Sequence, residues 1–123
     1  MTDPVSDPRP ALRLRVVFEG GRRLGPGKAD LLELVRETGS ISAAGRRMGM
    51  SYKRAWTLIE DLNAMFRRPL VHSTRGGAKG GGARLTEAGD SVLAHYRALE
   101  RAAARGGRAD LDALVAQLRD RPG

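Results

Sequence analysis

The sequence predicts a mainly α-helical domain with a small β-sheet, and three observations support this fold class. Apolar residues recur at helical spacing in several segments that end at glycine or proline. Two short runs typical of strands flank a tract of glycines, and a longer alternating run precedes the first helical segment. The length of 123 residues fits one domain with a tail, because two independent cores need a longer chain.

The N-terminal part of the chain changes character at residue 11. Residues 1–10 contain three prolines and no apolar periodicity, so we expect a disordered leader there. From residue 11 to residue 19, apolar and polar residues alternate, which predicts a strand with one buried face. The Gly20-Gly21 pair and the Gly25-Pro26-Gly27 run predict a loop after it. The expected buried face comprises Leu12, Leu14, Val16 and Phe18.

Two helices are predicted next. The first covers residues 28–38, where apolar residues recur at helical spacing up to Gly39, a residue type that commonly ends helices. The second is short and rich in alanine and glycine. We expect Ser42 to cap its N-terminus, because a serine hydroxyl satisfies free backbone N–H groups there, and Gly49 to end it after Met48.

A longer helix and a hairpin follow. The helix is predicted from Tyr52 to about Arg67, with Ser51 as its N-terminal cap and a stop before Pro69. Its expected buried stripe is Ala55, Ile59, Leu62 and Phe66. Residues 70–74 and 83–85 predict the two strands of a hairpin, whose tip is the glycine tract 76–82.

The C-terminal third predicts two more helices. The longer one covers residues 86–104 with Thr86 as its cap, and Gly106-Gly107 separates it from a short helix over 109–119. The apolar stripe of the longer helix is Val92, Tyr96, Leu99 and Ala103, and we expect it to form a dimer surface. The short helix presents Leu111, Leu114, Val115 and Leu118 on one face. The predicted organisation is therefore a leader (1–10), a domain (11–105) and a short C-terminal helix with a tail (106–123).

Positive charge is concentrated in the middle of the chain. Lys and Arg number 22 against 14 Asp and Glu, a formal net charge of +8. Residues 40–85 carry nine basic and two acidic residues, a net charge of +7, which leaves +1 for the rest. A concentrated excess of this kind favours a polyanionic partner over a charge that serves solubility alone.

The composition also excludes several function classes. The chain has no cysteine, and its two histidines, His72 and His95, stand apart, so we expect no metal centre and no cofactor. Glycine-rich stretches lack the spacing of a phosphate-binding loop, and we expect no enzyme activity. No apolar run reaches 18 residues, so we expect a cytoplasmic, nucleoid-associated protein without membrane contact.

The segment 39–66 has the pattern of a helix-turn-helix, and the hairpin after it has the pattern of a wing. Small residues in the first helix permit close packing, which leaves the second helix free to enter a major groove. We expect Lys53 and Arg54 to contact bases and Arg46 and Arg47 to contact phosphates. The full set of predicted DNA-contacting residues is Ser42, Arg46, Arg47, Ser51, Tyr52, Lys53, Arg54, Thr57, Arg75, Lys79 and Arg84.

The run GSISAAGRRMGMSYKRAW, the segment LIEDLNAMF, the glycine-rich wing and LTEAG together resemble a known domain. It is the N-terminal DNA-binding domain of the ModE-type molybdate-responsive regulators, within the LysR-type winged helix class. The similarity covers about residues 12–105, and its most specific parts are SYK-x-AW at 51–56 and the K-G-G-G wing at 79–82. It implies a winged helix-turn-helix that binds double-stranded DNA as a homodimer through the helix after Thr86.

One departure from this family concerns the sensor. Family members carry C-terminal oxyanion-binding domains, whereas only about 18 residues follow the matching region here. We therefore do not expect this chain to bind molybdate, and the sequence assigns no other small-molecule effector. The expected function is a sequence-specific transcriptional regulator, with molybdenum-related genes as candidate targets.

Two alternatives stay open at this point. The first is an architectural, nucleoid-type protein that binds DNA without operator choice. The second is an interaction module that recruits a separate sensor protein. Discrete binding sites across a genome distinguish a regulator from an architectural protein, and co-purification without DNA would favour the interaction module.

Overall fold

The computed structural model describes residues 11–74 and 82–120. Five helices are present in these ranges: α1 (Pro26–Thr38), α2 (Ile41–Arg47), α3 (Tyr52–Met65), α4 (Glu87–Gly106) and α5 (Arg108–Ala116). Two antiparallel strand pairs accompany them: β1 (Val16–Val17) with β2 (Arg23–Leu24), and β3 (Val71–Ser73) with β4 (Ala83–Leu85). The predicted fold class, mainly α with a small β content, is confirmed. The expected leader 1–10 lies outside the described residues.

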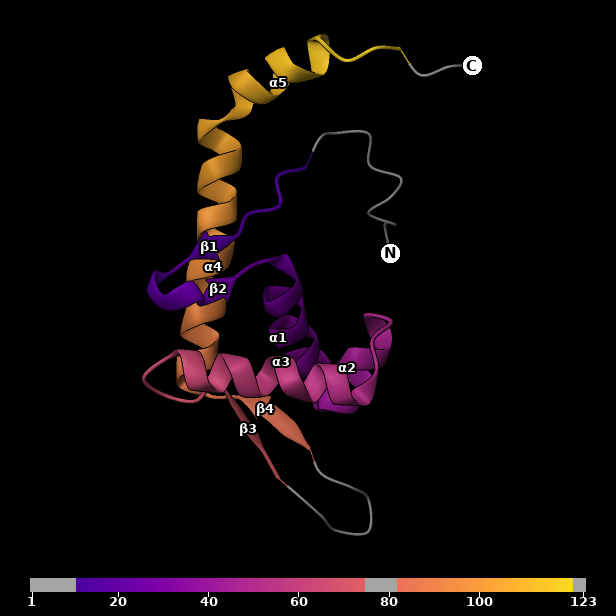
Figure 1. Cartoon of the computed structure of the whole chain (residues 1–123), viewed down its shortest axis with the longest axis vertical. Coiled ribbons are helices and arrows are strands. Elements are labelled where there is room, and N and C mark those ends of the chain that lie inside the picture. The colour runs from indigo at the N-terminus through magenta and orange to yellow at the C-terminus, as the bar shows by residue number, and fades with distance from the viewer. Residues whose placement is uncertain (1–10, 75–81, 121–123) are drawn as a thin grey trace.

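Helices α1, α2 and α3 form the body of the molecule (Figure 1). The β3–β4 hairpin extends from one side of this body, and the β1–β2 hairpin lies on the other side of α3. Helix α4 runs past the body and ends in α5, well away from it. In the described part of the chain, no helix combines the length and apolar character needed to cross a bilayer.

One apolar core joins the three body helices to the hairpin strands and to the first half of α4. Its fully buried members include Leu31, Leu32, Ile59, Leu62, Leu70 and Leu93. Tyr96 is 2% exposed and belongs to the same cluster. Its hydroxyl donates a hydrogen bond of 2.6 Å to the Leu14 carbonyl oxygen, which binds the N-terminal segment to α4.

The predicted N-terminal strand is correct in its alternation of buried and exposed residues and wrong in its length. Leu12, Leu14 and Val16 are half-buried between exposed neighbours, as the pattern predicts, but Phe18 is exposed. Only two residues of the expected strand form a ladder, and β2, their partner in the described part of the chain, is itself two residues long. The expected loop at Gly25-Pro26-Gly27 is wrong, because Pro26 begins α1, where its missing N–H leaves no hydrogen bond unmade.

The predicted cap of the second helix is wrong by two residues. Ser40, rather than Ser42, caps α2, and its Oγ accepts a hydrogen bond of 3.0 Å from the Ala43 backbone N–H. Ile41, which is buried in the core, is already the first residue of the helix, so the serine before it is the one in the cap position. The predicted caps Ser51 and Thr86 are confirmed: each side chain accepts a hydrogen bond from the backbone N–H three residues ahead.

The helix ends and stripes also differ in detail. Helix α3 ends at Met65, and Phe66 lies beyond it with its ring edge-on to Phe18. Leu58 completes the buried face of α3. On α4 the buried face is Gly89, Leu93 and Tyr96, so Tyr96 lies in the core of its own protomer and not on the predicted free stripe. Helix α5 covers a shorter range than the predicted 109–119.

Candidate nucleic-acid interface

The interface begins with the close approach of α2 to α3. Gly45 faces Ala55, and a Cβ added at Gly45 would lie only 2.8 Å from the Ala55 Cβ. Ala44 and Ala55 are both fully buried at this contact. The turn between the helices contains Gly49 at φ +71°, a conformation that glycine adopts without steric cost. Small residues therefore allow the tight helix-turn-helix packing that the sequence predicts.

Helix α3 presents its first turns to solvent. Tyr52, Lys53, Arg54 and Thr57 are all exposed, and Ser51 fixes the helix start through its bond to the Arg54 N–H at 3.0 Å. Within the described part of the chain, neither Lys53 nor Arg54 forms a salt bridge. Two cations at a helix N-terminus are unfavourable for the helix dipole, so this position favours an external anion.

Thr57 and Tyr52 have local partners. The Thr57 hydroxyl donates to the Lys53 carbonyl oxygen at 2.9 Å, which leaves its lone pairs available as acceptors. Tyr52 is 59% exposed, and its ring meets the Trp56 ring edge-on, with 6.0 Å between centroids. Trp56 itself is half-buried and packs against the core. Among the described residues, its buried Nε1 has no hydrogen-bond partner.

Helix α2 supplies further basic side chains next to this face. Arg46 and Arg47 are exposed in its last turn. The Ser42 hydroxyl accepts a hydrogen bond of 2.9 Å from Arg46 Nη1, so Ser42 orients that guanidinium. Arg47 forms an exposed ion pair with Glu37 at 3.4 Å. Such a pair contributes little in water, so Glu37 holds the Arg47 guanidinium only weakly.

The base of the wing is attached to the body. In the hairpin, His72 pairs with Arg84 and both side chains are exposed, while Val71 and Leu85 are buried. The Ala83 N–H donates to the Gly39 carbonyl oxygen at 2.9 Å, which ties β4 to the end of α1. The predicted contacts Arg75 and Lys79 lie outside the described residues, as does the glycine tract except for Gly82.

The sequence matches the model of a bacterial regulatory helix-turn-helix protein of the lysR family over residues 28–90, more than half of the chain. The chain belongs to this lysR family. The matched range begins within α1 and ends in the first turn of α4, so it contains both helices of the motif and both strands of the wing.

Two of three relatives of this lysR-family chain have names that mention molybdenum, and the third is named as a transcriptional regulator. The chain is 44% identical over 90 residues to the molybdenum-pterin-binding protein MopB of Rhodobacter capsulatus, covering 73% of this chain and 33% of that protein. It is 39% identical over 88 residues to the molybdenum transport protein ModE of Azotobacter vinelandii, covering 72% and 33%. It is 38% identical over 71 residues to the transcriptional dual regulator ModE of Escherichia coli K12, covering 58% and 27%. The chain thus spans about a third of the length of these relatives.

Solved structures of lysR-type proteins share the fold. The DNA-binding domain of CbnR, solved with DNA, superposes with a TM-score of 0.56 at 24% identity, over 72% of this chain and 95% of that chain. Full-length LysG from Corynebacterium glutamicum superposes with a TM-score of 0.55 at 22% identity, over 77% of this chain and 30% of that chain. At these identities the superpositions bear on the fold alone.

The predicted dimerisation stripe of this lysR-family chain is divided by the structure. Tyr96 is buried, Val92 and Ala103 are half-buried, and Leu99 is 51% exposed. Beyond it, α5 has no buried residue. Its large apolar side chains Leu114 and Val115 are 62% and 43% exposed, and Leu118 just beyond the helix is 71% exposed. The outer half of α4 and all of α5 therefore form an arm with an uncovered apolar surface, which we name the α4–α5 arm.

Arg97 anchors α4 to the body just before this arm. Its guanidinium lies 2.8 Å from Asp30 and 3.2 Å from Glu33, both on α1, and 3.0 Å from Glu100 on α4. Burial by itself would lower the pKa of Arg97, but its hydrogen bonds to the carboxylates outweigh burial and raise that pKa above its usual value. Burial is also the main reason why the pKa of the neighbouring Tyr96 is raised.

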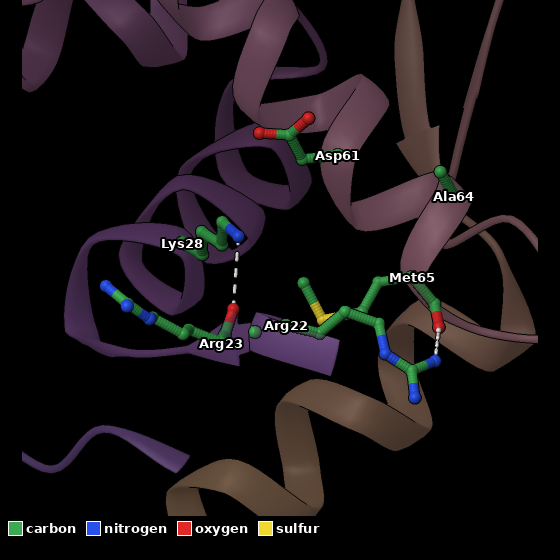
Figure 2. Close-up of a pocket in the computed structure, with 7 residues that line it drawn as sticks. Arg22, Arg23, Lys28, Asp61, Ala64 and Met65 are labelled. Carbon is green, nitrogen blue, oxygen red and sulfur yellow. Dashed lines mark hydrogen bonds between the residues drawn. The ribbon is translucent and has the colours of Figure 1, made fainter. Parts of the chain in front are cut away.

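A hollow of about 360 Å³ lies between β2, the start of α1 and the second half of α3. Arg22, Arg23 and Lys28 line it, but Figure 2 shows that their charged groups do not converge on one point. Lys28 Nζ donates to the Arg23 carbonyl oxygen at 3.0 Å, and Arg22 Nη1 donates to that of Met65 at 3.4 Å. These cations serve to join segments of the fold, and Asp61 offsets part of their charge.

Two residues that matter for the interface were missed by the sequence reasoning. Asn63 on α3 makes three hydrogen bonds to the backbone that leads into the wing. Gly89 in the first turn of α4 packs directly against the backbone of Leu70. The sequence contained a signal for each residue. Asn63 is a polar residue on the apolar side of α3, and Gly89 is a glycine inside a helix; both are unfavourable there without a specific contact.

Proposed function

We propose that this chain is the DNA-binding part of a sequence-specific transcriptional regulator. In this proposal the first turns of α3 enter a major groove, α2 and the wing contact the flanking backbone, and two copies bind the two half-sites of an operator. One observation carries the proposal: a capped α3 presents Lys53 and Arg54 to solvent, while its other face is buried in the core and packs against α2.

The chemistry of this face suits a duplex. Arginine and lysine donate to guanine O6 and N7, tyrosine and threonine hydroxyls donate and accept, and helix N-termini attract phosphates. The family match and the names of the relatives support the same function. The DNA complex of the CbnR domain is consistent with this way of using the fold.

Binding to labelled duplexes tests the proposal. Selection from a random duplex library would supply the preferred sequence, and affinity would be measured at several salt concentrations. We expect tight binding that weakens steeply with salt, because basic side chains displace counterions from phosphates. Lys53→Ala and Arg54→Ala should each reduce discrimination between preferred and random duplexes by about 1–3 kcal/mol.

The matched control is Arg119→Ala, which removes the same charge from an exposed position beyond α5. It should leave discrimination unchanged. Equal affinity for all duplexes would contradict the regulator and favour an architectural protein, whereas absence of salt-dependent binding would contradict DNA binding altogether.

The second copy is proposed to join through the α4–α5 arm. A contiguous apolar surface on a soluble protein marks an interaction site, and the commonest small assemblies are two-fold dimers. Such a dimer would place the two α3 helices about one helical turn of DNA, roughly 34 Å, apart. Sedimentation should give a dimer, and Leu99→Glu should give a monomer that still binds a half-site weakly. A wild-type monomer at micromolar concentration would contradict this arrangement.

The target genes are proposed to serve molybdenum handling. This rests on the names of the relatives, two of which are molybdenum transport proteins called ModE. The library-selected sequence, located in the genome of the source organism, provides the test. Sites upstream of molybdenum transport or molybdenum enzyme genes would support this target class, and sites elsewhere would replace it.

A further inference from the structure

The backbone that leads into the wing is bound from two sides. On one side lies Asn63 of α3, which is half-buried. Its Oδ1 accepts hydrogen bonds from the backbone N–H groups of Leu70 at 2.8 Å and Val71 at 3.0 Å. Its Nδ2 donates to the Val71 carbonyl oxygen at 3.2 Å. Two backbone N–H groups face one terminal atom of the side chain, and a backbone carbonyl oxygen faces the other. Among side chains of this length, only a carboxamide has both the acceptor and the donor that this arrangement requires.

On the other side lies the first turn of α4. The Thr86 hydroxyl donates to the Pro69 carbonyl oxygen at 2.7 Å. The Thr86 N–H donates to the Leu70 carbonyl oxygen at 2.9 Å. Gly89 allows this turn to lie directly against Leu70, where a side chain would overlap the Leu70 backbone. The first turn of α4 binds carbonyl oxygens of this backbone, whereas the N–H groups of Leu70 and Val71 donate to Asn63. Both residues are buried from water.

Val71 determines how the wing leaves the body. It is the first residue of β3 and pairs with Leu85, the last residue of β4. Its N–H and its carbonyl oxygen are both held by Asn63. Asn63 lies ten residues after Lys53 on the same helix, about 15 Å along its axis. A single rigid helix therefore carries the predicted base contacts near one end and the attachment of the wing near the other.

We propose that Asn63 is a positioning residue for DNA binding, which fixes the direction of the wing relative to the exposed first turns of α3. The wing and α3 then meet one stretch of duplex in a single fixed geometry. This inference rests on the proposed function in one respect only, namely that the wing contacts DNA. Loss of Asn63 should reduce the contribution of the wing to affinity and leave that of Lys53 intact.

A double-mutant cycle tests this role. Arg84 is the described basic residue of the wing, and we expect Arg84→Ala to weaken binding about fivefold, equivalent to about 1 kcal/mol. In the Asn63→Ala protein the same Arg84→Ala change should weaken binding less than about twofold, since the wing no longer keeps its place. Lys53→Ala should cost the same in both backgrounds. An undiminished effect of Arg84→Ala in the Asn63→Ala protein would overturn the proposal.

A second measurement requires no DNA. Amide hydrogen exchange of β3 and β4 should become faster in Asn63→Ala, and less so in Asn63→Asp, whose carboxylate keeps both acceptor bonds and loses the donor to Val71. Tyr96→Phe is the control for the single bond lost in Asn63→Asp, because it also removes one half-buried side chain–backbone hydrogen bond but lies away from the wing. Unchanged exchange at β3 and β4 in Asn63→Ala would overturn the proposal.

The two failures are distinguishable. If Arg84→Ala leaves the affinity of the otherwise unchanged protein unaltered, the proposed wing contact with DNA is wrong. Exchange then still decides whether Asn63 holds the wing. Asn63→Asp retains two of the three hydrogen bonds, so it keeps the test available if Asn63→Ala does not fold.

Discussion

Replacing Gly89 with alanine should destabilise the fold far more than replacing another glycine of the same helix. A Cβ at Gly89 would overlap the Leu70 carbonyl oxygen, which is backbone and has no side-chain torsion through which to move away. The first turn of α4 must then separate from Leu70, which breaks two hydrogen bonds made by Thr86. Gly106→Ala is the matched control, since a Cβ there meets nothing within 4 Å.

The size of the effect follows from three contributions. Two lost hydrogen bonds cost about 1 kcal/mol each in net terms. Residual overpacking costs about 1–3 kcal/mol, and the better helix propensity of alanine returns about 0.5–1 kcal/mol. The free energy of unfolding should therefore fall by about 2–4 kcal/mol, which corresponds to a lower melting temperature by about 10 °C or more.

Urea unfolding followed by far-ultraviolet circular dichroism measures both variants. Gly106→Ala should unfold with a free energy equal to that of the wild type or up to about 1 kcal/mol higher. A Gly89→Ala protein within about 0.5 kcal/mol of the wild type would refute the reasoning, because it would mean that α4 and Leu70 separate at almost no cost.

Four further changes have defined expectations. Gly45→Ala should lower stability by about 1–2 kcal/mol, because overpacking against Ala55 exceeds the helix-propensity gain, and an unchanged urea midpoint would count against the tight α2–α3 contact. Ser51→Ala should cost about 1 kcal/mol as a lost cap, and it should also lower DNA affinity by fraying the first turn of α3; an affinity equal to the wild type would show that this turn is not used. Arg97→Met should cost about 1–3 kcal/mol because three carboxylates lose their partner, and high salt should reduce the difference. The pKa of Tyr96 is raised in the folded protein, mainly by burial. The contribution of its neutral hydroxyl to the free energy of unfolding is therefore complete below the unfolded pKa of about 10 and declines as the pH rises above it. Tyr96→Phe should remove this decline, which is measured by unfolding both proteins between neutral and alkaline pH.

The starts of α3 and α4 and the hairpin were predictable because their signals are local. Ser51 and Thr86 act on backbone groups within three residues, and the strands around the glycine tract are adjacent in sequence. The choice of Ser42 instead of Ser40 failed for a non-local reason. A serine lies on each side of Ile41 in the sequence. Ser40 is the cap because Ile41 is the first residue of the helix and is buried in the core.

The stripe on α4 failed for a similar reason. This helix has two apolar rows side by side, one with Leu93 and Tyr96 and one with Val92 and Leu99. Helical periodicity finds both rows but does not say which one meets the core, because that depends on how α4 crosses α1. The partners of Asn63 were not predictable for the same reason: they are backbone groups seven and eight residues away, whose positions exist only once the wing has formed.

The contacts of α4 change abruptly along its length. Up to Tyr96 the helix is held by the core, and Arg97 then joins it to two carboxylates of α1. Helix α1 in turn binds the wing through Gly39 and packs against α2 and α3. The direction of the α4–α5 arm is therefore fixed relative to α3 by charged and apolar contacts outside the proposed DNA-binding face. If the second copy joins through this arm, the spacing between the two α3 helices depends on Arg97 and Gly89 as much as on the apolar arm itself.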